Sequence, residues 1–402
     1  MGRQPRHRGC DHRGIGHLPD HAALCEVSRR LAVSLTGAGA PNIEKIMANI
    51  PVTVLTGFLG SGKTTLLNRA LRDPQLKGTV VIVNEFGEIG LDHELIEASS
   101  DSVVLLQNGC LCCSVRGDLV ETLIDLHQKR LKGEIPEFDH VVIETSGLAE
   151  PTPVTEVLVA APGVKSCFSL AGIVTTVDAV NGLATLDAHE QSVKQIALAD
   201  RIVMTKSDLL TRPDELRERL ARLNPACEVL DAREVDAGAL MRFVASNRQE
   251  PAWRVVAAQQ GERQVHGGSS QGEAHGHDAR IKRFTIVRDE PWDLETLKLL
   301  LEALATNAGP ALLRVKGLIH MQDSPERPAV IHGAQQLVHS LSWLDRWPSE
   351  DRRTRIVFIT MDQGAEEIGE LVEDIERLSQ RTRAVRERAA NHTGAVTGGA
   401  NR

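Results

Sequence analysis

Several features are missing from this sequence, and each absence excludes a class of protein. No run approaches the roughly 18 unbroken apolar residues that a bilayer crossing needs. The opening of the chain contains no apolar stretch followed by a small-residue cleavage site, which argues against a secretory signal. The formal net charge is −8, which argues against a nucleic-acid-binding face spread over the whole molecule. We therefore expect a soluble protein with no membrane and no nucleic acid among its partners.

The cysteine count excludes a fully paired disulfide framework, because the chain contains seven cysteines. Three of them crowd into one short segment, as Cys110, Cys112 and Cys113. Unpaired, clustered cysteines are typical of a reducing compartment. We expect a cytoplasmic protein.

The 402 residues are enough for two domains, and the apolar fraction of 42% is that of a globular protein. Composition and periodicity divide the chain into five parts. Met47 is followed directly by the first apolar strand pattern, so we expect it to be the physiological start. The predicted parts are a poorly ordered N-terminal extension (1–47), a nucleotide-binding domain (48–257), a flexible His-containing linker (258–280), a C-terminal domain (281–382) and a disordered tail (383–402).

Short apolar runs alternate with helical patterns through the larger domain. The runs are IPVTVLT, TVVIVN, SVVLL, HVVIE, AGIVTTVD, RIVMT and CEVLD. Helices are predicted over 66–71 and 119–131, and the second has a stripe of leucines at helical spacing. Strands that are apolar on both sides predict an α/β fold with a mostly parallel sheet covered by helices on both faces. Beyond 280, four strand patterns are predicted, namely IKRFTIVRD, ALLRVKGLIHMQ, PAVIHGAQQLVHS (328–340) and TRIVFITMD. With only two helices, 294–304 and 365–378, they predict a smaller α+β domain with an antiparallel sheet.

A phosphate-binding loop follows the first strand pattern. Residues 57–64, GFLGSGKT, fit the pattern G-x-x-x-x-G-K-[ST] and lie between a predicted strand and a predicted helix, as a P-loop requires. Glycines allow backbone N–H groups to turn inward around phosphate oxygens. Lys63 is predicted to neutralise the β- and γ-phosphates and Thr64 to bind Mg²⁺. The predicted nucleotide-binding residues here are Gly57, Gly60, Ser61, Gly62, Lys63, Thr64 and Thr65.

Two later segments complete the predicted nucleotide site. Glu144 ends an apolar strand, where P-loop NTPases hold the water shell of Mg²⁺, and Gly147 can present a backbone N–H to the γ-phosphate. The strand RIVM leads into Thr205-Lys206-Ser207-Asp208. The carboxylate of Asp208 can accept both N1–H and N2–H₂ of guanine, which favours GTP over ATP. The alternative for Asp208 is a helix N-cap.

The cysteine loop places three candidate thiolates within four positions. Thiolates select Zn²⁺, Cu⁺ and similar ions, and three sulfur ligands leave the fourth tetrahedral position open for transfer. Cys112 and Cys113 cannot face one point from an extended strand, so either the loop turns there or two of the three cysteines bind at once. The alternative is a reduced cysteine cluster without metal.

These motifs together resemble those of the CobW-type GTPases, a metallochaperone family related to UreG and HypB. The resemblance covers about residues 48–362. The segments that carry it are GFLGSGKTTLLN (57–68), NEFGEIGLD (84–92), NGCLCC (108–113), ETSGLAEP (144–151), TKSD (205–208), RVKGLIH (314–320) and VIHGAQQLVH (330–339).

The resemblance implies a GTPase that couples hydrolysis to the custody of a metal, usually zinc, for a client metalloprotein. It implies that Glu85 joins the three cysteines as a metal ligand, and that Glu85 to Asp92 contact Mg²⁺ and the γ-phosphate. Many relatives have a long His run in the linker, whereas this chain offers only His266, His275 and His277. A solvated linker is therefore the better interpretation of that segment. The implied catalytic residues are Lys63, Thr64, Glu85, Asp92 and Glu144.

Three alternatives to a zinc chaperone stay open from the sequence. The first is a chaperone that delivers cobalt for cobalamin synthesis or iron to a metalloenzyme, because thiolate sites bind metals by availability as well as preference. The second is a storage or sensing module in which GTP only locks a conformation. The third is a P-loop kinase, which the guanine motif and the cysteine loop argue against. The sequence also allows a homodimer.

Overall fold

The structure is a computed structural model. It describes residues 49–84, 106–107, 115–209, 214–242, 280–304, 306, 311–334, 337–338, 341–362 and 365–397. The segment Asn49–Arg402 forms one compact unit. Every helix among the described residues is too short or too polar to span a bilayer.

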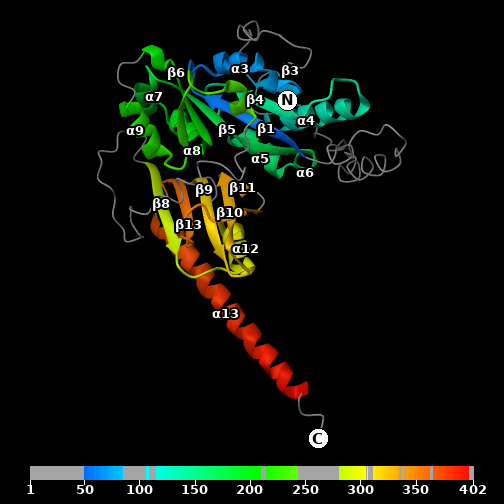
Figure 1. Ribbon diagram of the computed structural model, residues 1–402, viewed down its shortest axis with the longest axis vertical. Coiled ribbons are helices and arrows are strands. Elements are labelled where there is room, and N and C mark those ends of the chain that lie inside the picture. Colours follow the sequence, from blue (N-terminus) through cyan, green and yellow to red (C-terminus); the bar gives the residue numbers. More distant parts are fainter. Residues whose placement is uncertain are drawn as a thin grey trace, which may run out of the picture. The chain divides into compact units, whose positions relative to one another are not determined.

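The first domain is built on a seven-stranded sheet in the order β3-β2-β4-β1-β5-β6-β7, in which all neighbouring strands run parallel (Figure 1). β1 lies in the middle of the sheet, and β4 and β6 are buried along their whole length. The carboxyl ends of all seven strands therefore meet at one edge. The strands are β1 (Ile50–Gly57), β2 (Thr79–Asn84), β3 (Leu106–Gln107), β4 (His140–Thr145), β5 (Phe168–Asp178), β6 (Arg201–Thr205) and β7 (Glu228–Asp231).

Helices pack on both faces of this sheet, as the sequence predicts. On one face the leucine stripe of α4 packs against Val54 and Ile143. On the other face α3 and α10 pack against Leu55 and Val142. The helical segments are α3 (Lys63–Leu71), η1 (Pro74–Leu76), α4 (Val115–Lys132), α5 (Thr152–Ala160), α6 (Pro162–Lys165), α7 (Gly182–Ala188), α8 (Glu190–Leu198), η3 (Ser207–Leu209), α9 (Asp214–Leu223) and α10 (Ala237–Met241).

The second domain is the predicted antiparallel sheet with two helices. Its main path runs β11-β10-β9-β13-β8, and β12 pairs with β10 (Figure 1). One face is covered by α12 and α13, whose Leu297, Leu300 and Val372 pack against Ile356 and Phe358 of the sheet. The elements are β8 (Ile281–Arg288), α12 (Leu294–Ala303), β9 (Leu312–Met321), β10 (Ser324–Ala334), β11 (Leu337–Val338), β12 (Ser342–Trp343), β13 (Thr354–Met361) and α13 (Ala365–Thr397).

Two details of this domain differ from the sequence-based expectation. The strand predicted over 328–340 is two strands, β10 and β11, and β10 begins earlier, at Ser324. Helix α13 runs to Thr397, whereas the sequence predicted a disordered tail from 383. The extension is rich in Arg and Ala, which are strong helix formers.

The other face of the antiparallel sheet packs against the first domain. Ile281, Leu313 and Ile359 share an apolar cluster with residues of α8 and α9, and Val357 packs near Ala226. In the middle of this contact Arg314 and Lys316 of β9 face Asp200, which lies between α8 and β6. All three side chains are buried. The two domains are therefore joined by a buried ionic contact that is surrounded by apolar side chains.

Candidate nucleotide-binding site

The P-loop connects β1 to α3 through backbone conformations that favour glycine. Gly57, Gly60 and Gly62 have φ values of 142°, 69° and 85°. A Cβ atom on Gly57 would lie 2.4 Å from the Thr176 hydroxyl and 2.5 Å from its carbonyl oxygen. The loop therefore packs tightly against β5, and helix α3 begins directly after Gly62 with its N-terminal N–H groups at the loop.

Lys63 lies inside the curve of the loop. Its Nζ donates to the carbonyl oxygens of Gly57, at 3.1 Å, and Phe58, at 3.4 Å, and its side chain is buried. Ser61 exchanges a 2.6 Å hydroxyl contact with Thr176. Thr65, also predicted to bind nucleotide, is exposed on α3. A buried ammonium group surrounded by a glycine-rich loop is what phosphate neutralisation requires.

Thr64 and Glu144 meet at the carboxyl end of β4. The Thr64 hydroxyl donates to Glu144 Oε1 at 2.7 Å, and the Glu144 side chain is buried. The two residues lie 80 positions apart in the sequence. Mg²⁺ prefers a few carboxylate and hydroxyl oxygens together with phosphate oxygens. The donor set therefore fits the ion that the sequence predicts.

Gly147 lies against the P-loop. A Cβ atom added to it would be 2.7 Å from the backbone nitrogen of Leu59 and 2.8 Å from its Cα. Backbone atoms cannot yield as the end of a flexible side chain can, so glycine is required at this position. The segment that contains Gly147 and the phosphate loop are in direct contact.

The guanine motif follows β6. Thr205 donates from its hydroxyl to the Ser61 carbonyl at 2.7 Å, which joins the motif to the P-loop. Lys206 has a φ of 56°, in the left-handed region, and its Nζ donates to the Gly60 carbonyl and to Asp178 at 2.8 and 2.6 Å. Asp208 is exposed, in the middle of η3 rather than before a helix. Its carboxylate is thus accessible at the edge where the P-loop lies.

Asp178 fixes the position of the motif lysine. Burial opposes its ionisation, but hydrogen bonds from Lys206 and from the side chain and backbone of Asn181 outweigh that effect and lower its pKa. Nearby, Ser207 donates to Asp231 at 2.8 Å, and hydrogen bonds from Arg233 lower the pKa of that carboxyl well below its usual range. Two ionised carboxylates therefore support the motif from β5 and β7.

A cavity of about 300 Å³ opens beside the P-loop, between the end of β5 and helices α7 and α8. Gln195 of α8 lines it and is only 1% exposed. Its Nε2 donates to the carbonyls of Gly147, at 3.2 Å, and Ala149, at 2.9 Å. The cavity is also lined by Phe58, Ser61, Thr176, Asp178 and Lys206.

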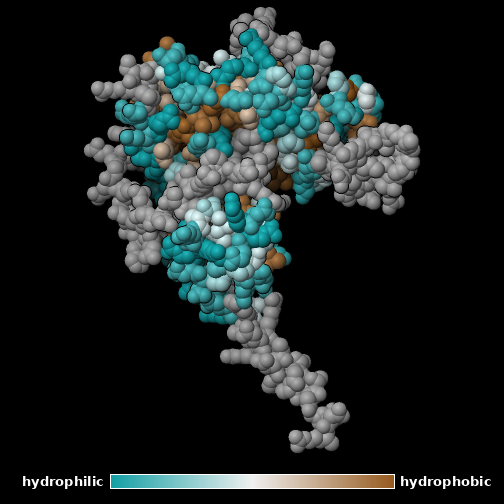
Figure 2. Space-filling model, viewed as in Figure 1, coloured by the Kyte–Doolittle hydropathy of each residue, from teal (hydrophilic) through white to brown (hydrophobic). Residues whose placement is uncertain are grey.

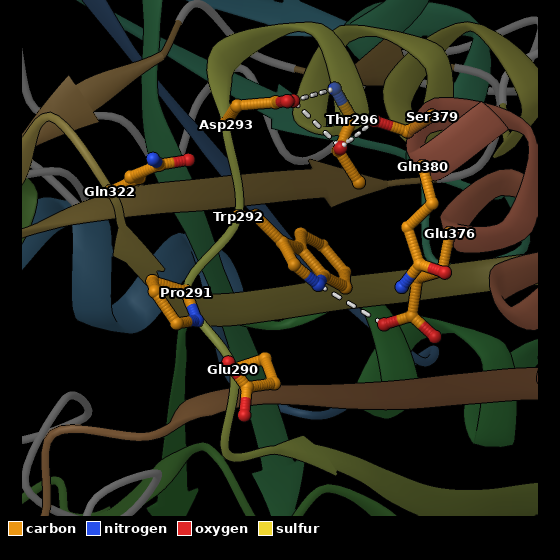
Figure 3. Close-up of a pocket in the computed structure, with 9 residues that line it drawn as sticks. All are labelled: Glu290, Pro291, Trp292, Asp293, Thr296, Gln322, Glu376, Ser379 and Gln380. Atoms are coloured by element: carbon orange, nitrogen blue, oxygen red, sulfur yellow. Dashed lines mark hydrogen bonds between the residues drawn. The ribbon is translucent and has the colours of Figure 1, made fainter. Parts of the chain in front are cut away.

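A second hollow, of about 410 Å³, lies in the C-terminal domain (Figure 3). Trp292 lies at its centre and donates from Nε1 to Glu376 at 3.1 Å, while Asp293 accepts from the backbone and hydroxyl of Thr296. The Thr296 hydroxyl also contacts Ser379 at 2.5 Å. These polar groups bond one another and tie α12 to α13, and no predicted nucleotide residue lines the hollow.

The distribution of exposed apolar side chains also differs between the domains. Figure 2 shows apolar surface gathered over the nucleotide-binding domain, whereas the visible face of the C-terminal domain is mostly hydrophilic. Leu59, Leu148, Val180 and Leu209 are all more than 40% exposed, and they follow β1, β4, β5 and β6 respectively. They rim the same edge as the nucleotide motifs.

Five predicted site residues lie outside the described residues. They are Glu85, Asp92, Cys110, Cys112 and Cys113, and the linker histidines are outside as well. The elements on either side are described: β2 ends at Asn84, β3 ends at Gln107 and α4 begins at Val115. Across the described ranges, no group of three or more His, Cys, Asp or Glu side chains is arranged to hold a metal ion.

Two residues of the site were missed by the sequence analysis. Asp178 ends an apolar strand, the same signal that identified Glu144, so the pattern was available. Gln195 carries no such signal, because a glutamine within an amphipathic helix resembles any polar position. Its role becomes visible only from its contacts with Gly147, 48 positions away.

Comparison with known proteins decides the family. Residues 51–231 match the family described as CobW/HypB/UreG, nucleotide-binding domain, and residues 281–376 match the cobalamin synthesis protein cobW C-terminal domain. The zinc chaperone YjiA of Escherichia coli is 32% identical over 330 residues, which cover 80% of this chain and 97% of the relative. The chain belongs to the CobW/HypB/UreG family. The family membership predicted from the motifs is thereby confirmed.

Other relatives agree with this assignment. The zinc chaperone CobW of Sinorhizobium sp is 28% identical over 361 residues, covering 79% of this chain and 95% of the relative. Among solved structures, the Zn(II)-bound YjiA GTPase from E. coli is similar to this chain with a TM-score of 0.60 and 27% sequence identity. The match covers 82% of this chain and 99% of the YjiA chain. The P-loop fold with an added antiparallel domain, predicted from sequence, is confirmed by both domain matches and this structure.

Proposed function

We propose that the protein is a GTP-hydrolysing metallochaperone that binds a transition metal, most of all zinc, and delivers it to client metalloproteins. One observation carries the proposal. In a member of this family, the P-loop, Glu144, Gly147 and the guanine motif meet at one edge of one parallel sheet, with direct contacts between them.

Each nucleotide contact has a residue suited to it. Lys63 neutralises the β- and γ-phosphates, and Thr64 with Glu144 holds Mg²⁺, which supplies further charge neutralisation when bound. The Gly147 N–H is directed to the γ-phosphate. Asp208 accepts the two donors of guanine while Lys206 lies along the purine face. In this arrangement the chain positions and polarises GTP, and water is the acceptor.

The metal is the cargo of the reaction, and Cys110, Cys112 and Cys113 are its proposed ligands, together with Glu85. Their neighbours support this assignment. Because the sheet is parallel, the carboxyl ends of β2 and β3 lie at the same edge as the P-loop. Glu85 follows β2 directly and the cysteines follow β3. Nucleotide state and metal affinity are then coupled, and the coupling is reciprocal.

Zinc is favoured over cobalt by the relatives, several of which are named zinc chaperones. The client protein and a homodimer stay predictions. The alternative of a GTP-gated storage or sensing module differs in turnover: it predicts stoichiometric GTP binding without stimulation of hydrolysis by metal or client.

The test compares two substitutions in two assays. Lys63→Ala should lower GTP hydrolysis at least about a hundredfold and leave bound zinc unchanged, because phosphate neutralisation is lost. Cys112→Ser should lose zinc under a competing chelator and keep basal hydrolysis. The chelator matters because a YjiA triple mutant lacking a glutamate and two cysteines was still crystallised Zn(II)-bound.

Cys167→Ser is the matched control, since Cys167 is a half-buried cysteine outside the proposed site. It should keep both activities. Stoichiometric zinc in Cys112→Ser would show that the cysteine loop is not the site. Undiminished hydrolysis by Lys63→Ala would contradict the nucleotide assignment.

A further inference from the structure

Residues 146–149 form a tight turn after β4. The Ala149 N–H donates to the Ser146 carbonyl at 3.0 Å, which closes the turn around Gly147 and Leu148. The Ser146 carbonyl and the Gly147 N–H belong to the same planar peptide unit. Anything that holds this turn therefore sets the direction of the Gly147 N–H.

The side chain of Gln195 is hydrogen-bonded to the 146–149 turn. The side-chain amide nitrogen of Gln195 donates to the carbonyls of Gly147 and Ala149. Because the Ser146 carbonyl accepts from Ala149 within the turn, three carbonyls of the turn are hydrogen-bonded. The side chain is nearly fully buried, and its Oε1 finds no hydrogen-bond partner among the described residues. Gln195 lines the cavity beside the P-loop, which is roomy enough for an ordered water.

The helix that carries Gln195 is fixed at both ends. At its start, the His189 ring stacks on Phe58 of the P-loop, with ring centroids 4.4 Å apart. At its end, Asn224 donates to the Ile196, Ala197 and Ala199 carbonyls, and Arg314 of the C-terminal domain donates to the Leu198 carbonyl. Between them, Thr175 donates from β5 to the Gln195 carbonyl at 3.0 Å. Such a helix supports the turn as a rigid element.

We infer that Gln195 is a positioning residue of the GTPase reaction, which sets the direction of the Gly147 N–H through the 146–149 turn. The inference rests on the proposed function, because it takes Gly147 as the contact of the γ-phosphate. Gln195 touches neither nucleotide nor metal and acts through the backbone of the turn. GDP lacks the γ-phosphate, so its binding does not depend on this device.

The test is Gln195→Met, which keeps the length of the side chain and removes both donors. We expect kcat for GTP to fall about tenfold, because a small displacement of a catalytic contact is costly. KM for GTP and Kd for GDP should stay within about twofold of wild type. Gln195→Glu should lose at least as much, since a carboxylate faces two carbonyl oxygens and donates to neither.

Gln191→Met is the matched control, because Gln191 is exposed on the same helix. It should match wild type in kcat and in GDP affinity. Unchanged kcat in Gln195→Met would overturn the inference, and so would a loss of GDP affinity in step with kcat, which would indicate general damage to the domain. If Lys63→Ala abolishes hydrolysis while Gln195→Met does not affect it, only this inference fails. If Lys63→Ala retains hydrolysis, the proposed site itself fails.

Discussion

The two sheets of this protein place their polar side chains at different points along the strands. In the parallel sheet, Glu144, Asp178 and Thr205 stand at or next to the carboxyl ends of β4, β5 and β6, where they bond Thr64, Lys206 and Ser61 respectively. In the antiparallel sheet, Arg314 and Lys316 stand in the middle of β9 and are almost completely buried. The polar residues at these strand ends lie beside the P-loop and the guanine motif, whereas the two charges within β9 join the domains.

The largest loss of stability is expected when the buried contact of Arg314 and Lys316 with Asp200 is broken. Asp200→Asn keeps the shape of the side chain, and its oxygen still accepts from the Ile173 N–H. It leaves Arg314 and Lys316 buried without their carboxylate, so we expect a loss of about 3 to 5 kcal/mol in the free energy of unfolding. Urea unfolding followed by tryptophan emission measures it, since Trp292, Trp343 and Trp347 all lie in the C-terminal domain.

Two variants sharpen this prediction. Arg314→Met leaves Lys316 opposite Asp200, so its loss should be smaller than that of Asp200→Asn. Asp345→Asn removes an exposed partner of Arg327 and should change stability by less than about 0.5 kcal/mol. A larger loss for Arg314→Met than for Asp200→Asn would show that the carboxylate is not the centre of the contact.

The next effect concerns the amino end of the parallel sheet, where a neutral group is buried. Thr53 donates to the Met241 carbonyl, so His140 Nε2 donates to the Thr53 hydroxyl. Burial, followed by the nearby charge of Arg242, lowers the pKa of His140 from 6.5 to about 4. The unfolded chain then binds the proton first as the pH falls.

The contribution of neutral His140 to the free energy of unfolding is therefore fully present above pH 6.5. It is lost as the pH falls toward about 4, and the total loss is about 3 kcal/mol. His127 contributes in the same direction, because burial and Arg130 lower its pKa as well. Unfolding by urea at a series of pH values measures the slope. His140→Gln should flatten it between pH 6.5 and 4, and an unchanged slope would contradict the assignment.

Among the three sites compared, the smallest effect on stability is expected just after the end of β4, where the effect on activity is large. Gly147→Ala brings a Cβ against the backbone of Leu59, so the phosphate loop or the turn must shift. We expect kcat for GTP to fall about a hundredfold, with about 1 to 3 kcal/mol lost in stability, which is less than in Asp200→Asn. Steady-state hydrolysis and thermal unfolding measure the two quantities. If stability fell as much as in Asp200→Asn, the distinction between strand-end and mid-strand positions would not hold.

The features that could be predicted from the sequence are those determined by residues close together in the chain. The strands of the first domain appear as apolar runs, and the P-loop appears because its backbone path requires glycine at Gly57, Gly60 and Gly62. Contacts over long separations left no such pattern. Arg314 and Asp200 are 114 positions apart, and a charged residue within a strand predicts exposure rather than a buried pair. Gln195 was hidden for the same reason.

The central position of β1 has a consequence for synthesis of the chain. β1 is made first among the described strands, yet both of its neighbours in the sheet, β4 and β5, are encoded much later. At about 5 to 20 residues per second, the roughly 120 residues between Gly57 and Asp178 take roughly 6 to 24 seconds to translate. Neither partner exists until β4 is made, and until β5 is complete the apolar P-loop strand can be paired on one side only. The strand is therefore exposed to incorrect pairing during synthesis.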